Sequence, residues 1–178
     1  MALGEDLERA AAAGAAFGGV TAVLAAEPAA GRRAYLVALG EDDARAWLVL
    51  DGDLAPVPDR ERVREVASIV VLCELAGELA GGGQIEELRN QLAQVRLTER
   101  PEGIEVAEDA ALALEHAIGA PPLVASPAYL DAVGAAAMAL ERALGDLASP
   151  FAKALAASAP TVEAFVLEVE GRHTVPLR

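Results

Sequence analysis

The longest apolar stretch of the chain runs from Val66 to Ala76 and reads VASIVVLCELA, interrupted only by Ser68 and Glu74. It lies within a segment, residues 60–80, whose ends carry charged residues. At 100° per residue its apolar positions fall on nearly every side, which is typical of a helix surrounded by protein. Some of its residues are β-branched, but strands usually run for about four to eight residues and this segment is far longer. The pattern therefore predicts a buried central helix over residues 60–80.

The residues before this helix predict an N-terminal helix and a three-stranded antiparallel meander. The expected elements are a helix over 3–16, strands over 19–26, 33–39 and 45–50, and turns at 27–31 and 40–43. Residues 19–26 fit either a helix or a strand, and the short connections that follow favour a strand. Both faces of these strands are apolar. The sheet is therefore expected to be covered on both sides, by helices or by another subunit.

After the central helix, the pattern predicts mainly further helices. They are expected over 84–97, 104–118, 128–144, 151–157 and 162–170, and the last of these also fits a strand. In the helix over 104–118, Val106, Ala110, Ala113, Leu114 and Ala117 are expected on the buried side. Residues 119–126 are expected to form an ordered loop, and 172–178 a loose tail.

These elements predict a helix-dominated α+β fold in a single domain, residues 1–178, with five or six helices packed around the central helix over 60–80. The part that contains the meander is expected over about 1–58, and the helical part over about 59–171. The chain is 54% hydrophobic but only 3% aromatic, so its core must consist largely of alanine, leucine and valine. Such small side chains bury little area per residue, which favours burial of additional surface between subunits. We therefore expect a homo-oligomer or a complex with another protein.

The formal net charge is −14, with 28 acidic and 14 basic side chains. Such a surface repels phosphate backbones and anionic lipid headgroups, which argues against nucleic-acid and membrane partners. Cys73 is the only cysteine, so the chain cannot form an internal disulfide and a cytoplasmic location is expected. The uncharged run 10–26 follows acidic residues rather than a positive start, which is not typical of an export signal.

The strongest candidate for chemistry is Glu74, the one carboxylate inside the apolar stretch. If this position is desolvated, Glu74 could act as a general acid or base in a reaction that needs no cofactor. Against this, one sector of the helix holds Arg64, Val71, Glu74 and Glu78, and such a sector is typical of a solvated helix edge. The structural interpretation is favoured.

Other residues are weaker candidates for binding a ligand: Tyr35, Trp47, Ser68 and Cys73. Cys73 would need a neighbouring histidine to act as a nucleophile, and neither His116 nor His173 has a spacing that brings it close. Ser68 is expected to bond back to a carbonyl one turn earlier. Tyr35 and Trp47 could line a pocket, pack in the core or lie at an interface.

No metal site or cofactor is expected from the sequence. The two histidines lie far apart, and the acidic turns at 41–43 and 51–53 lack the spacing of a calcium loop. The glycines at 81–83 are followed by no Lys-Ser or Lys-Thr, so they predict a corner between helices rather than a phosphate loop. The sequence thus favours a non-enzymatic, self-associating interaction or scaffold module. The alternatives are a protein that binds a small apolar ligand and an enzyme that uses Glu74.

Overall fold

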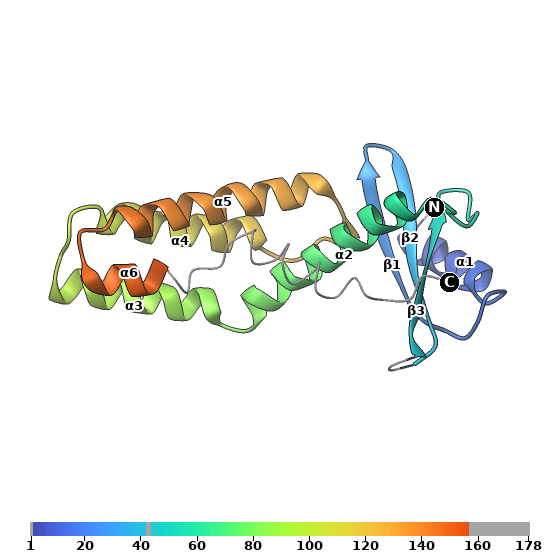
Figure 1. Cartoon of the computed structure of the whole chain (residues 1–178), viewed down its shortest axis with the longest axis horizontal. Coiled ribbons are helices and arrows are strands. Elements are labelled where there is room, and N and C mark those ends of the chain that lie inside the picture. Colours follow the sequence, from blue (N-terminus) through green and yellow to red (C-terminus); the bar gives the residue numbers. More distant parts are fainter. Residues whose placement is uncertain (1, 42–43, 157–178) are drawn as a thin grey trace. The chain divides into compact units, whose positions relative to one another are not determined.

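The computed structural model describes residues 2–41 and 44–156, with the backbone alone at 152 and 153. The described chain separates into two compact units. Unit 1 contains residues 1–73 and 122–127, and unit 2 contains residues 74–121 and the described residues from 128 onward. Helix α2 (Arg60–Gly81) contributes its first part to unit 1 and its last part to unit 2 (Figure 1). That the whole chain behaves as one domain remains a prediction.

Unit 1 is built on a sheet with the strand order β3-β2-β1-β4. Strands β1 (Val20–Ala29), β2 (Arg32–Leu39) and β3 (Ala46–Asp51) form the predicted antiparallel meander. Strand β4 (Val124–Ala125) pairs in parallel with β1, so the sheet is mixed and has a fourth strand. The prediction of three strands was incomplete because β4 is only two residues long and lies in a segment that reads as a loop.

Strand β1 extends three residues beyond its predicted end. The register with β2 shifts between Ala26 and Ala29, and Pro28 lies at this shift. Proline has no backbone N–H to donate to a ladder, so it is tolerated in a strand where the ladder is interrupted. The turn is therefore shorter than the predicted 27–31, and Gly31 adopts the left-handed φ of +72° that the turn requires.

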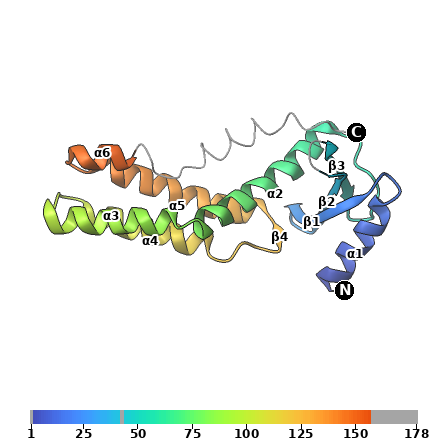
Figure 2. The same ribbon diagram turned by 90° about the horizontal axis from the view of Figure 1, so that it is seen from below.

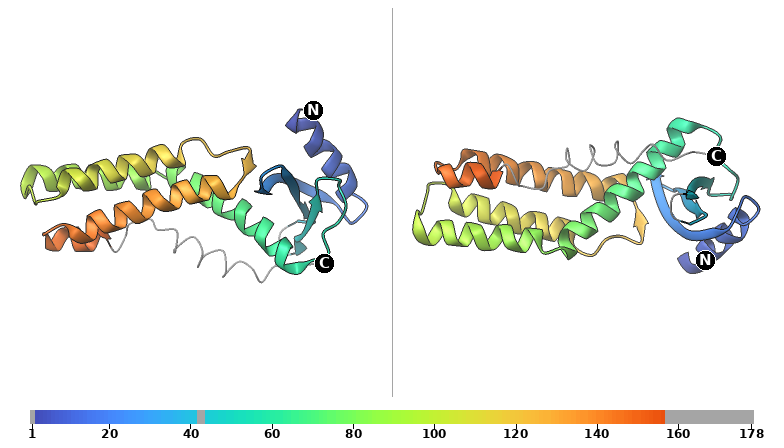
Figure 3. Two further views of the ribbon diagram at one scale, coloured as in Figure 1. Left: turned by 90° about the horizontal axis from the view of Figure 1, so that it is seen from above. Right: turned by 60° about the horizontal axis from the view of Figure 1, so that its bottom comes forward.

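The two apolar faces of the sheet are both covered within this chain. Tyr35, Val37 and Leu50 share a buried cluster with Ala10 of α1 (Leu3–Gly14). The opposite face carries Leu36, which is 1% exposed. On that side lies the first part of α2, and Figures 2 and 3 show α1 and this part of α2 on opposite sides of the sheet. Helices of the same chain therefore cover the sheet, which was one of the two predicted alternatives.

Helix α2 has the predicted bounds to within one residue, and its middle is shielded from solvent. From Val66 to Cys73 every residue is buried or half-buried. Its start is capped by Asp59, whose Oδ1 atom accepts the Glu61 N–H at 3.0 Å. The later helices meet its last part, since Ala76 and Leu79 belong to their common core, whereas its first part belongs to unit 1.

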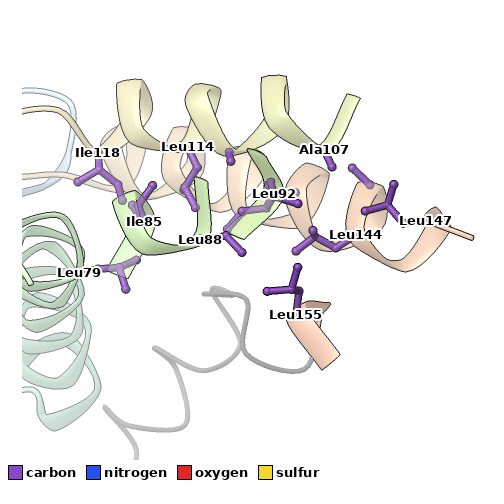
Figure 4. Packing of buried hydrophobic residues seen from close by; sticks show 14 of the residues in the cluster. Leu79, Ile85, Leu88, Leu92, Ala107, Leu114, Ile118, Leu144, Leu147 and Leu155 are labelled. Atoms are coloured by element: carbon purple, nitrogen blue, oxygen red, sulfur yellow. The ribbon is translucent and has the colours of Figure 1, made fainter. Parts of the chain in front are cut away.

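Unit 2 is a helical unit made of the last part of α2 with α3 (Gln84–Thr98), α4 (Ile104–Ile118), α5 (Pro127–Asp146) and α6 (Pro150–Ala156). Its core is aliphatic, and Leu92, Leu114 and Leu144 are fully buried where these helices meet (Figure 4). The Tyr129 hydroxyl donates to the Ile118 carbonyl at 2.8 Å, which ties the start of α5 to the end of α4.

The buried face of α4 differs from the predicted one. The buried residues are Ile104, Ala107, Ala111, Leu114 and Ile118, at alternating spacings of three and four. Leu114 was correctly placed, but Val106 is 64% exposed and Ala113 is also exposed. The two isoleucines at the ends of α4 set the buried stripe, because they carry more apolar area than the valine and alanines on the neighbouring face.

Among the described helices, no single one is long and apolar enough to cross a membrane. Helices α2 and α3 pass such a test only when taken together, and the chain bends by 49° between them. The predicted element at 162–170 and the tail at 172–178 lie outside the described residues.

Candidate functional site

Glu74 lies at an exposed position of α2. Arg64 and Glu78, which the sequence places in the same sector of the helix, are exposed as well, and Val71 is half-buried. This sector is the solvated edge of α2. The geometry therefore favours the structural interpretation of Glu74 over a desolvated acid or base.

Ser68 and Cys73, the two other candidates on α2, lie in its part within unit 1. Ser68 is half-buried and Cys73 is buried, with 4% of its surface exposed. His116 lies exposed on α4 in unit 2, and His173 lies outside the described residues. The burial of Cys73 agrees with the interpretation of this thiol as part of the core.

Tyr35 and Trp47 lie on opposite faces of the sheet. Tyr35 pairs with Leu50 on the face that α1 covers, whereas Trp47 pairs with Ala38 on the other face. The guanidinium carbon of Arg45 lies 6.0 Å from the centroid of the Trp47 ring, at the limit of a cation–π contact. The structure does not bring these two aromatic residues into one pocket.

The acidic turns do not form a metal centre in the described part of the chain, where no group of three or more potential ligands converges. Asp51 has a local role instead. Its Oδ1 atom accepts the backbone N–H groups of Asp53 at 3.0 Å and Ala55 at 2.9 Å. These bonds close the turn after β3, in which Leu54 adopts a φ of +65°. Residues 42 and 43 of the other acidic turn are outside the described chain.

A charged hollow of about 670 Å³ lies in unit 1. Four arginines and four carboxylates take part in lining it, together with Tyr35, and they come from α1, the β1–β2 hairpin, the turn after β3 and the start of α2. The charged residues are Asp6, Arg9, Glu27, Arg32, Arg33, Asp51, Asp53 and Arg62. Of the candidate residues named from the sequence, Tyr35 alone is among the described residues that line this hollow.

A second hollow, of about 650 Å³, lies in unit 2 at the turn between α3 and α4. Leu97 and Val106, which are 65% and 64% exposed, contribute apolar side chains to its lining. Arg96 and Arg100 line it from the end of α3, and Glu102 and Glu105 from the turn and the start of α4. We call the set of these six residues the α3–α4 patch. It combines an apolar centre with charges of both signs.

The turn that carries the patch is held in a defined shape. Arg100 has a φ of +45° and Gly103 has a φ of +88°, so two residues of this short turn are left-handed. An ion pair joins Arg96 to Glu108 at 3.4 Å and ties α3 to α4. The Ser149 hydroxyl donates to a Glu99 carboxylate oxygen at 2.7 Å, which connects this turn to the start of α6. The ion pair and the hydrogen bond therefore hold the turn that carries the patch in place.

Neither hollow was predicted from the sequence. The charged hollow draws residues from four separate segments, and no local spacing connects them. The α3–α4 patch was missed because Val106 was assigned to the buried face of α4. A closer comparison of the two possible stripes would have found it, since only the stripe with Ile104 and Ile118 places large side chains at both ends.

Comparisons of the chain with protein-family models, with curated proteins and with solved structures give no match.

Proposed function

We propose that this protein is a non-enzymatic cytoplasmic interaction module that self-associates through the α3–α4 patch. The observation that carries the proposal is the exposure of both Leu97 and Val106 in the lining of one hollow. Most large apolar side chains of unit 2 are buried in its core, so two exposed apolar side chains in one hollow are a candidate interface centre. The single cysteine supports the cytoplasmic location.

The charges around the patch favour a second copy of this chain as the partner. An interface with two-fold symmetry brings the same patch together from both copies. If the axis runs between the end of α3 and the start of α4, Arg100 of one copy faces Glu102 of the other. The six patch residues carry a formal charge of zero, two arginines against two glutamates, within a chain of charge −14. The patch therefore adds no net charge repulsion between two copies.

The apolar sheet no longer supports self-association, because α1 and α2 cover its faces within one chain. The proposal rests on the helical unit instead. The hollow in unit 1 is lined largely by charged side chains, and the hollow at the α3–α4 turn is lined by both charged and apolar ones, which does not favour the alternative of a small apolar ligand. The exposure of Glu74 likewise does not favour the alternative of an enzyme that uses this residue.

Native mass spectrometry of the full chain at micromolar concentration tests the proposal. The wild-type protein is expected to form a dimer, and Leu97→Asp is expected to shift it to the monomer because a carboxylate would be buried at the interface centre. Met138→Asp is the matched control, since Met138 is 57% exposed on α5 and does not line the hollow. A wild-type monomer, or equal dissociation by both variants, contradicts the proposal.

A charge exchange makes the same test sharper. R100E and E102R each place like charges opposite one another in a symmetric dimer, so both variants are expected to be monomeric alone. When the two are mixed, the doubly negative patch faces the doubly positive one, and a heterodimer is expected. Absence of that heterodimer, with both variants folded, would argue against Arg100 facing Glu102.

A further inference from the structure

We propose that the charged hollow of unit 1 is a binding site for a carboxylate group, with Arg32, Arg33 and Arg62 as its donors. This site is separate from the α3–α4 patch and does not depend on self-association. The first argument is the convergence of arginine side chains. In a chain with 14 basic residues and a net charge of −14, four arginines line one hollow. They reach it from different elements, so helix periodicity does not account for their convergence.

Two of the four carboxylates of the hollow accept backbone N–H groups, and a third, Asp6, lies 3.7 Å from Arg9. Glu27 accepts the backbone N–H of Gly31 at 2.9 Å, and Asp51 accepts the N–H groups of Asp53 and Ala55. These two acidic side chains hold the turns at the rim of the hollow. They are consequently less available as partners for the arginines.

Arg32, Arg33 and Arg62 keep N–H donors that no carboxylate of the described chain uses in a direct hydrogen bond. Arg33 lies 3.8 Å from Asp6 and 4.0 Å from Glu27, distances that are too long for direct hydrogen bonds. Within the described part of the chain, Arg32 and Arg62 have no carboxylate within 4.0 Å. Guanidinium groups with unused N–H donors favour a planar anionic acceptor.

The charge balance selects a monoanionic group over a phosphate. Four arginines and four carboxylates give the lining a formal charge of zero. A dianion therefore experiences more repulsion from the carboxylates and from the acidic chain than a single carboxylate does. The forked geometry of a guanidinium also fits the two oxygens of a carboxylate. A small free acid and the C-terminus of a peptide both carry this group.

The test is an NMR titration of the full chain that follows the arginine Nε–Hε signals. The probes are acetate, N-acetyl-triglycine, the C-terminal amide of that peptide and inorganic phosphate. Saturable shifts with acetate or with the free peptide acid support the site, and the stronger of the two identifies the source of the carboxylate. Equal binding of the amide, tighter binding of phosphate, or no saturation with either carboxylate at about 20 mM overturns it.

Variants separate this site from general screening by salt. The double variant R32Q/R62Q is expected to weaken binding of the carboxylate about tenfold or more, because two charge-assisted donors are lost. R60Q is the matched control, since Arg60 is exposed on the same first turn of α2 as Arg62 but does not line the hollow. Equal weakening by R60Q would show that only the general charge matters. Both positions are exposed, so the variants are expected to fold, which circular dichroism checks.

Discussion

Gly77 is a position of α2 where one added methyl group meets a rigid neighbour. A Cβ atom at this residue would lie 2.7 Å from the Cγ atom of Pro121, within unit 2. Because the proline ring cannot rotate away, the loop that carries it must shift. The absence of a side chain at Gly77 thus permits the close approach of this loop to the helix.

Gly77→Ala is therefore expected to lower the free energy of unfolding by about 1 kcal/mol, the overpacking cost outweighing the gain in helix propensity. Gly145→Ala in α5 is the control, because a Cβ atom there meets nothing within 4 Å and the change is expected to stabilise by roughly 0.5 kcal/mol. Urea denaturation measures both. Pro121→Ala should relieve the clash in the double variant, and equal stabilisation by the two glycine variants would contradict this account.

Single residues also show where reading the sequence succeeds and fails. The caps at Asp59 and Ser149 were predictable, because a short polar side chain just before a helix commonly accepts a backbone N–H of the first helical turn. The exposure of Glu74 agrees with the solvated sector of α2 that the sequence indicated. The common hollow of Arg32 and Arg62 was not predictable, because it forms only when distant segments meet.

Among the elements, helix α4 offers the clearest separation of buried and exposed positions. Leu114 is fully buried in the core of unit 2, whereas Leu112, two residues earlier on the same helix, is 36% exposed. Leu114→Ala is expected to destabilise the protein by about 2 to 5 kcal/mol, since it removes apolar contacts and leaves a cavity. Leu112→Ala is expected to cost less than about 1 kcal/mol. Thermal unfolding compares them, and similar losses for both would mean that the buried stripe of α4 is wrongly assigned.

Most element bounds followed from the sequence, and the exceptions have physical causes. Helices α3 and α4 begin where predicted, because glycine and proline interrupt the periodic pattern on both sides. Strand β4 could not be recognised, because two residues show no periodicity and its pairing with β1 is non-local. The predicted buried face of α4 was partly wrong. Alanines indicate little about which face of a helix is buried, so the prediction depended mainly on Val106.

For the whole molecule, charge sets the conditions under which two copies can meet. Each chain carries a formal charge of −14, and at 0.01 M salt the Debye length of about 30 Å lets this repulsion act across the full approach. At 0.15 M salt it falls to about 8 Å, so distant charges are screened while the apolar centre of the α3–α4 patch is unaffected. Association through that patch is therefore expected to strengthen as salt rises.

Sedimentation equilibrium at 0.01 M and 0.15 M salt measures this effect. The dimer fraction is expected to increase at the higher salt, and Leu97→Asp is expected to remain monomeric at both. A decrease of the dimer fraction would show that the ion pairs between Arg100 and Glu102 outweigh the apolar contacts and the repulsion between net charges, which contradicts this prediction.

The pairing of β4 with β1 has a consequence for the nascent chain. Ala26 of β1 pairs with Ala125, 99 residues later. At roughly 5 to 20 residues per second, the ribosome needs about 5 to 20 s to synthesise the chain between them. Throughout that interval the sheet has an open edge of apolar residues, which is a template for pairing with other chains. Slower translation between residues 26 and 125 is thus expected to lower the yield of folded protein, even though no residue changes.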